Sequence, residues 1–113
     1  MNVFIIVFIA LFIVITWFCW GTTERYSLRH VSIQEVSFKP ADITIKVGDT
    51  VMWTNKDQIW HTATSGEPFS PNDIFNSGRL NSSDTFKYSF KKAGVYPYYC
   101  IPHPWMTGTI TVK

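Results

Sequence analysis

Three side chains that can bind a metal ion lie close together near the end of the sequence, in Cys100-Ile-Pro-His103-Pro-Trp-Met106. Their donor atoms belong to a thiolate, an imidazole and a thioether. The two sulfur donors favour Cu(I), whereas imidazole binds both oxidation states of copper, so the mixture suits one ion that cycles between Cu(I) and Cu(II). Taken singly, each residue has a plain structural alternative as core packing or as a surface group. Their joint spacing favours a metal site.

A second imidazole is available from His61, which follows a predicted strand that contains Trp53. Two histidines and one cysteine around copper, with a more distant methionine, are the donors of a mononuclear blue-copper site, whose chemistry is single-electron transfer. Pro102 and Pro104 each fix a backbone angle and are expected to stiffen the loop. Zinc with the same four donors is chemically possible, although methionine makes it a poor functional choice.

Two other functions use similar donors. A copper-trafficking or storage protein would bind mainly Cu(I) in an exposed, adaptable site. A small copper enzyme acting on oxygen or on a nitrogen oxide would need substrate access to this one ion, because the sequence has neither a His-x-His pattern nor a second cysteine in the same domain. A cysteine hydrolase fits poorly, since no predicted helix start or oxyanion site accompanies Cys100. An electron carrier without catalytic residues is therefore the favoured interpretation.

The elements that must position these donors are predicted to be strands. Apolar and polar residues alternate with period two over residues 43–47, 51–55, 86–90, 96–100 and 108–112. A hairpin or a corner is expected at Val47-Gly-Asp-Thr50, and a turn at Ala93-Gly94. Short strands at this spacing predict an all-β Greek-key sandwich spanning residues 30–113. The segment Thr64–Ser83, rich in Ser, Asn, Pro and Gly, is expected to be a long irregular connection.

On these motifs the sequence resembles the cupredoxins, and within them the plastocyanin and amicyanin-like group, over roughly Phe38 to Val112. The motifs are Phe38-x-Pro40, Gly48-Asp49-x-Val51-x-Trp53-x-Asn55 leading to His61, Phe75-x-Ser77-Gly78-x-Leu80, and Gly94-x-Tyr96-x-Tyr98-x-Cys100-x-x-His103-x-x-Met106-x-Gly108-x-Ile110. The two residues between His103 and Met106 are similar to the short ligand loop of amicyanin.

The resemblance implies that one copper ion is bound by His61, Cys100, His103 and Met106. It also implies that Asn55 ties the ligand loops together. Thr62 stands where many relatives have asparagine, and its hydroxyl is expected to bond across to the neighbouring loop. Such hydrogen bonds orient the imidazoles and tune the metal.

An apolar surface for redox protein partners is expected around His103, formed by Pro102, Pro104 and Trp105, since exposed apolar patches mark interaction sites. The alternative is that Trp105 folds over the copper as a lid, because tryptophan is usually mostly buried. The sequence does not name the partner, the reduction potential or the direction of electron flow.

Composition limits the classes of protein to which the chain can belong. The chain has 113 residues, of which 46% are hydrophobic and 16% charged, and this suits one folded domain. A net charge of +2 without long runs of like charge argues against nucleic-acid binding. Two cysteines in unlike surroundings, Cys19 and Cys100, exclude a disulfide framework. A monomer is expected.

The first twenty residues are predicted to be a transmembrane anchor or a signal peptide. An uncharged run from Val3 to Trp20 would form about 27 Å of helix at ~1.5 Å per residue, which nearly spans a bilayer. Its length and the lack of a basic start favour an uncleaved anchor over residues 3–20. Residues 21–29 are expected to be a tether. Arg25 and Arg29 follow the apolar run, and basic residues at this place would by themselves favour a domain in the cytoplasm. The copper chemistry instead favours a location outside the cytoplasm.

Overall fold

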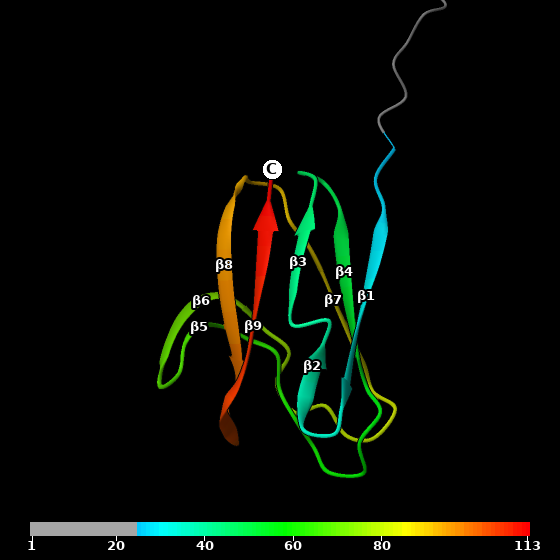
Figure 1. Cartoon of the computed structure of the whole chain (residues 1–113), viewed down its shortest axis with the longest axis vertical. Helices are drawn as coiled ribbons and strands as arrows, with labels where there is room; N and C mark the ends of the chain where they lie inside the picture. Colours follow the sequence, from blue (N-terminus) through cyan, green and yellow to red (C-terminus); the bar gives the residue numbers. More distant parts are fainter. Residues whose placement is uncertain (1–24) are drawn as a thin grey trace, which may run out of the picture.

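Two facing sheets make up the part of the chain that the computed structural model describes, residues 25–113 (Figure 1). The predicted membrane segment 3–20 and the first part of the predicted tether lie outside the described residues. The strands are β1 (Leu28–Gln34), β2 (Ser37–Lys39), β3 (Asp42–Ile45), β4 (Thr50–Asn55), β5 (Thr64–Glu67), β6 (Ser70–Asn76), β7 (Thr85–Ser89), β8 (Gly94–Cys100) and β9 (His103–Val112). The predicted all-β sandwich is confirmed.

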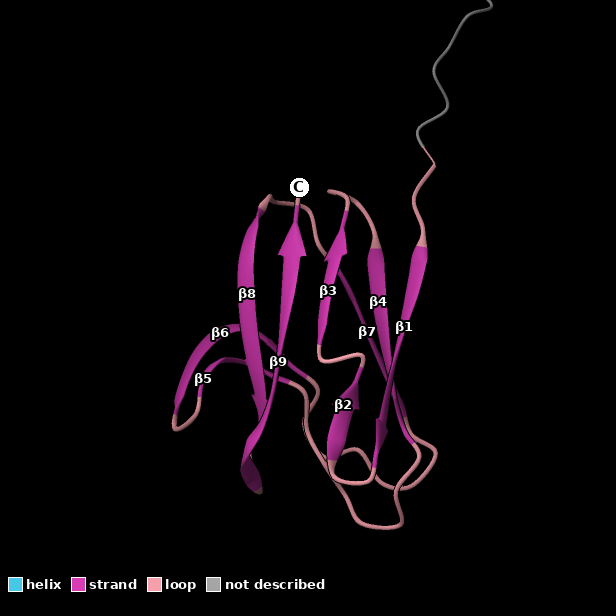
Figure 2. Ribbon diagram, in the orientation of Figure 1, coloured by secondary structure: helices cyan, strands magenta, loops and turns pink. Residues whose placement is uncertain are grey.

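The sheets combine strands that are distant in the sequence (Figure 2). One sheet has the order β2-β1-β4-β7 and the other β3-β9-β8-β5-β6. The pairs β1–β4 and β3–β9 are parallel, and all other neighbouring strands are antiparallel. Strand β1 begins at Leu28, so the first sheet includes the last two residues of the predicted tether.

Residues 46–49 form a corner, because β3 lies in one sheet and β4 in the other. Gly48 has a φ of 96°, which glycine adopts without steric cost. The carboxylate of the buried Asp49 accepts hydrogen bonds from the backbone amides of Ser27 at 2.8 Å and Lys46 at 3.0 Å. Of the two expectations for this turn, the corner is therefore the one observed.

The core between the sheets is rich in aromatic side chains. Trp53 of β4 and Tyr98 of β8 are buried and meet edge to face, with their ring centroids 5.5 Å apart. Phe75 of β6 packs against both rings. Gly108 of β9 leaves room for Tyr98, since a Cβ there would lie 2.4 Å from Tyr98 Cζ. Strands β8 and β9 are thereby held together close to the predicted donors Cys100 and His103.

The expectation of an irregular connection over Thr64–Ser83 is wrong for its first part, which forms the hairpin β5–β6. This part of the sequence shows no alternation because six of the seven residues of β6 are exposed, and Phe75 is the one that is buried. A register shift between Thr64 and Gly66 further interrupts the period. Within residues 25–113 there is no helix long and apolar enough to cross a membrane.

Candidate metal centre

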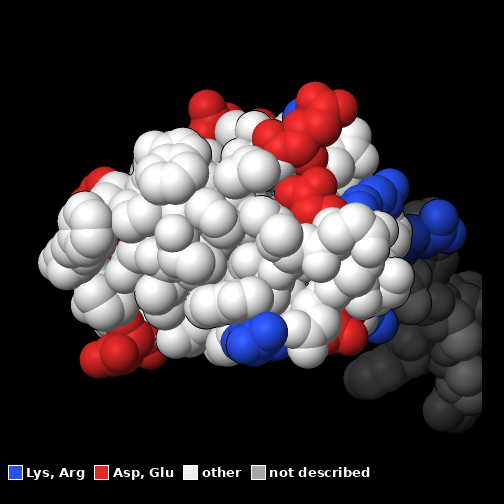
Figure 3. Space-filling view, turned by 90° about the horizontal axis from the view of Figure 1, so that it is seen from below, with Lys and Arg blue, Asp and Glu red and all other residues white. Residues whose placement is uncertain are grey.

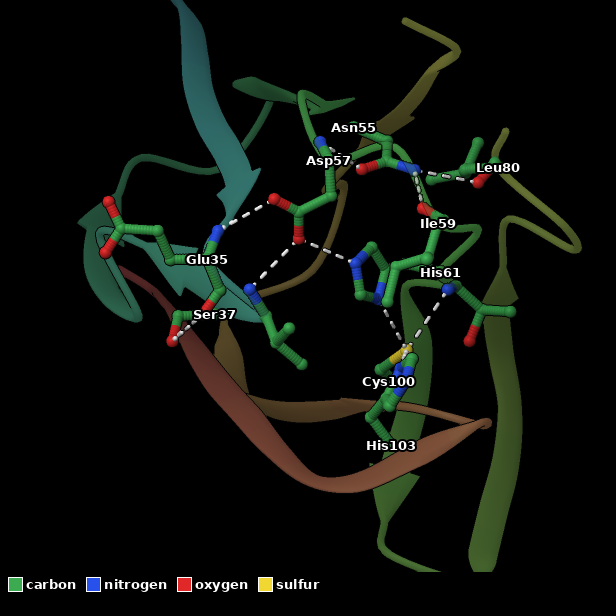
Figure 4. A network of polar contacts seen from close by, with 11 residues as sticks. Glu35, Ser37, Asn55, Asp57, Ile59, His61, Leu80, Cys100 and His103 are labelled. Carbon is green, nitrogen blue, oxygen red and sulfur yellow. Dashed lines mark hydrogen bonds and ion pairs between the residues drawn. The ribbon is translucent and has the colours of Figure 1, made fainter. Parts of the chain in front are cut away.

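Three of the predicted donors meet at one end of the sandwich (Figure 4). Cys100 ends β8 and His103 begins β9, so a tight connection brings them together. His61 lies between β4 and β5 and is fixed by two backbone hydrogen bonds with Leu80, of 3.0 and 2.8 Å. Cys100 Sγ lies 3.5 Å from His61 Nδ1 and 3.6 Å from His103 Nδ1. All three donor atoms lie within 4.8 Å of one another.

This spacing fits a single metal ion. Metal–sulfur bonds of about 2.3 Å and metal–nitrogen bonds of about 2.0 Å would place the two donor atoms about 3.5 to 3.8 Å apart around a shared ion. The observed sulfur–nitrogen distances of 3.5 and 3.6 Å match this range. A soft thiolate with two imidazoles is a donor set that suits copper. The distances between the donor atoms and the types of these donors therefore both fit a bound copper ion.

Met106, the fourth predicted donor, lies on β9 three residues beyond His103. It is buried and belongs to the same apolar cluster as Cys100. The metal centre thus adjoins the core directly, and water has little access from that side.

A carboxylate that the sequence analysis did not identify holds the buried His61. Asp57 Oδ2 lies 2.8 Å from His61 Nε2. A carboxylate only accepts hydrogen bonds, so Nε2 carries the proton and the lone pair of Nδ1 faces Cys100. Burial raises the pKa of Asp57, but hydrogen bonds from Val36, His61 and Glu35 outweigh it and leave this pKa below its ordinary value.

The same carboxylate fixes the turn between β1 and β2. Its two oxygens accept hydrogen bonds from the backbone amides of Glu35 at 2.8 Å and Val36 at 3.0 Å. Both residues have left-handed backbones, with φ values of 54° and 53°, which are unfavourable for a β-branched residue such as Val36. Asp57 therefore connects a strained turn to one of the metal-binding histidines.

Asn55 and Thr62 have different connecting roles. The Asn55 amide donates to the carbonyls of Ile59 and Leu80, and its oxygen accepts from the Asp57 amide. Asn55 therefore holds the loop that carries His61. The link between the two ligand loops comes from Thr62, whose hydroxyl accepts from the Ile101 amide at 2.9 Å and whose own amide lies 3.4 Å from Cys100 Sγ.

The surroundings favour neutral side chains before metal binding. Burial raises the pKa of the Cys100 thiol, and hydrogen bonds from Thr62 and His103 offset this only in part. Burial also lowers the pKa of His103, and the nearby His61 lowers it further. An incoming metal ion must therefore displace the thiol proton.

Exposure differs between the donors. His61 and Cys100 are fully buried, whereas His103 is partly exposed. Trp105 is 72% exposed, and its ring meets that of His103 edge to face at 5.3 Å between centroids. It lies beside the histidine with most of its surface open to solvent.

An apolar groove continues this surface. It is lined by Pro104 and Trp105 together with Pro68 and Phe69 from the β5–β6 hairpin. Phe69 is 84% exposed and was not identified from the sequence, because the hairpin itself was not predicted. This end of the sandwich is largely uncharged, and its charged side chains lie towards the edges (Figure 3).

The comparisons with known proteins agree with this centre. The family described as "Copper binding proteins, plastocyanin/azurin family" matches residues 27–113. Amicyanin of Paracoccus versutus is 30% identical over 83 residues, which cover 74% of this chain and 63% of the amicyanin. Plastocyanin of Scenedesmus fuscus is 35% identical over 85 residues, which cover 67% of this chain and 86% of the plastocyanin.

A solved structure agrees as well. A novel purple cupredoxin from Nitrosopumilus maritimus has a TM-score of 0.70 and 35% identity, with 75% of this chain and 99% of that chain covered. The two-sheet sandwich with its cluster of cysteine and histidines is thus a cupredoxin fold. The chain belongs to the plastocyanin/azurin family of copper-binding proteins.

Proposed function

We propose that this chain is a type 1 copper protein that carries single electrons between redox partners. One copper ion would be held by His61, Cys100 and His103, with Met106 as the more distant donor. The observation that carries the proposal is the convergence of a buried thiol and two imidazoles within 4.8 Å. When bound, copper supplies a one-electron couple between Cu(I) and Cu(II).

The contribution of the protein is to keep the donors in one arrangement. Asp57 fixes the tautomer of His61, and Thr62 holds the cysteine loop against the His61 loop. Donors fixed in this way need little rearrangement when the charge of the ion changes, which suits electron transfer better than metal delivery. A trafficking protein needs donors that can exchange, and burial of His61 and Cys100 opposes this.

We propose that partners dock on the surface formed by Pro102, Pro104 and Trp105, extended by the groove that includes Phe69. The support is its apolar character and its position around His103, the metal-binding histidine that is not fully buried. An apolar surface without strong charge suits transient complexes with several partners. Monomers acting by brief encounters would be sufficient.

We also propose that the domain works outside the cytoplasm and is held at a membrane by residues 3–20. The support is the uncharged run from Val3 to Trp20. A copper site that relies on a single thiol also suits a compartment without strong competition from cellular thiols.

The visible and paramagnetic-resonance spectra of the copper-loaded chain test the copper assignment. We expect an intense thiolate-to-Cu(II) band and reversible one-electron reduction. Cys100→Ser should abolish the band, and Cys19→Ser is the matched control that should keep it. A band that survives Cys100→Ser contradicts the ligand assignment, and a colourless chain that rapidly exchanges Cu(I) would favour copper trafficking.

A further inference from the structure

A group of basic side chains surrounds a shallow pocket at the end of the sandwich opposite the metal centre. The pocket is lined by Arg25, Lys46, Lys91 and Lys113, together with Tyr26, Val47 and Gly48. The basic residues come from the start of the described chain, the corner after β3, the β7–β8 loop and the end of β9. We call these four basic residues the basic pole. All four are exposed.

Little negative charge balances the basic pole. Asp49 lies close by, but it is buried and its oxygens accept from the Ser27 and Lys46 backbone amides. Within residues 25–113, the two contacts between basic and acidic side chains are Lys39–Glu35 and His61–Asp57, both near the metal centre. The basic pole is therefore available to an external anionic surface.

The described part of the chain begins at this pole, just before β1 (Figure 1). Ser27 is fixed by two backbone contacts, since its amide donates to Asp49 at 2.8 Å and its carbonyl accepts from Thr50 at 3.0 Å. The Tyr26 ring packs over Gly48, where a Cβ would lie 2.2 Å from Tyr26 Cε1. Lys91 Nζ lies 5.9 Å from the centre of the same ring. The chain is thus part of the sandwich from Tyr26 onward.

The link to the apolar run is consequently short. Between Trp20 and Tyr26 the chain can span at most about 22 Å, because an extended residue covers ~3.3–3.6 Å. Screening at physiological salt limits the attraction of exposed charges to about 8 Å. A link of this length allows the basic pole to come into contact with a membrane that holds the run.

We propose that the basic pole rests on the anionic phospholipid headgroups of the membrane that holds residues 3–20. The proposal rests on the proposed membrane attachment. Basic groups next to a membrane segment are attracted to anionic lipids, and an aromatic side chain such as Tyr26 suits the interface. The metal centre then faces away from the lipid, with the apolar docking surface open to partners.

Lysine footprinting of the full chain tests this orientation. The chain is inserted into phosphatidylcholine nanodiscs with and without about 30% phosphatidylglycerol, and reductive methylation of each lysine is followed by mass spectrometry. We expect Lys46, Lys91 and Lys113 to be modified about threefold more slowly on the anionic discs, and about 0.5 M salt to remove the difference. Lys39 and Lys56, at the metal end, should react equally on both.

A pair of double variants supplies the matched comparison. Lys46→Glu with Lys91→Glu should abolish the protection of Lys113, whereas Lys39→Glu with Lys56→Glu carries the same charge change and should preserve it. The visible spectrum of each variant reports whether it is folded. Equal modification rates on the two disc types, or protection of the metal end instead, would overturn the proposal.

Flotation with phosphatidylcholine vesicles separates this proposal from membrane attachment itself. A chain that does not float contradicts the predicted anchor, yet protection of the three lysines on phosphatidylglycerol vesicles still supports the basic pole. A chain that floats without any such protection keeps the anchor and contradicts the lipid contact. Binding of an acidic protein in place of lipid would give this second result.

Discussion

Asp57→Asn tests the connection between the β1–β2 turn and the metal centre. One Asp57 oxygen accepts from the Glu35 amide, and the other accepts from both Val36 and His61. An asparagine has a single acceptor oxygen, so in either orientation its NH₂ group faces at least one of these donors. The substitution thus removes a charge-assisted bond or replaces it with a contact between two donors.

The cost can be estimated from these contacts. A hydrogen bond to a charged group contributes about 1.5–3 kcal/mol, and this range sets the expected loss of stability. We expect metal-free Asp57→Asn to lose about 2 to 3 kcal/mol of unfolding free energy. For a domain of this size that corresponds to a decrease in Tm of about 10 to 20 °C.

Thermal and urea unfolding followed by circular dichroism measure this loss. Asp73→Asn is the control, because this exposed residue has a φ of 62°, which asparagine tolerates well. Copper-loaded Asp57→Asn should also have a higher reduction potential, since a carboxylate on His61 favours the more positive ion. A variant within about 0.5 kcal/mol of the original chain would refute the proposed role of the carboxylate.

Three further predictions concern other parts of the sandwich. Gly108→Ala should lower the unfolding free energy by about 1–3 kcal/mol in urea titrations, because the new Cβ would lie 2.4 Å from Tyr98 Cζ and 2.6 Å from a backbone oxygen. Trp105→Lys should slow electron self-exchange of the copper protein, measured by NMR line broadening, by about tenfold, because it opposes like charges in the encounter complex. Stability should decrease as the pH falls below 3.8, the ordinary pKa of Asp49, because backbone hydrogen bonds from Ser27 and Lys46 hold its folded-state pKa lower.

Each of these has a matched comparison. Thr107→Ala, at an exposed neighbouring position, should change stability by less than about 0.5 kcal/mol. Val95→Lys adds the same charge at a 66% exposed site on β8 and should leave self-exchange unchanged. Asp49→Asn should reduce the slope of the acid transition, and an unchanged slope would mean that other carboxylates cause it.

Much of the sandwich follows from alternation, because a strand buried on one face repeats every two residues. The strands containing Trp53, Tyr98 and Ile110 lie at or near their predicted positions for this reason. Strand β6 has little such pattern, since it is exposed at every residue except Phe75. Its hairpin is specified by pairing with β5 and by a turn at Pro68 and Phe69, neither of which leaves a period in the sequence.

The residues of the metal centre also differ in how far the sequence predicts them. Cys100 and His103 were predictable because a short loop between two strands cannot separate them, and His61 because the strand framework places it nearby. Asp57 carries no such signal. Its importance comes from hydrogen bonds with a turn more than twenty residues earlier in the chain, and only the assembled sandwich brings these groups together.

The unequal exposure of the two imidazoles has a consequence for how redox partners can bind to the protein. With His61 fully buried and His103 partly exposed, the proposed electron transfer would reach the surface most directly at the edge of His103 beside Trp105. The electron donor and the electron acceptor would then bind to the same surface one after the other, and both could not occupy it at once. The rate of electron transfer through such a carrier is limited by the dissociation rate of each partner complex. Weak, short-lived complexes are therefore favoured over tight ones.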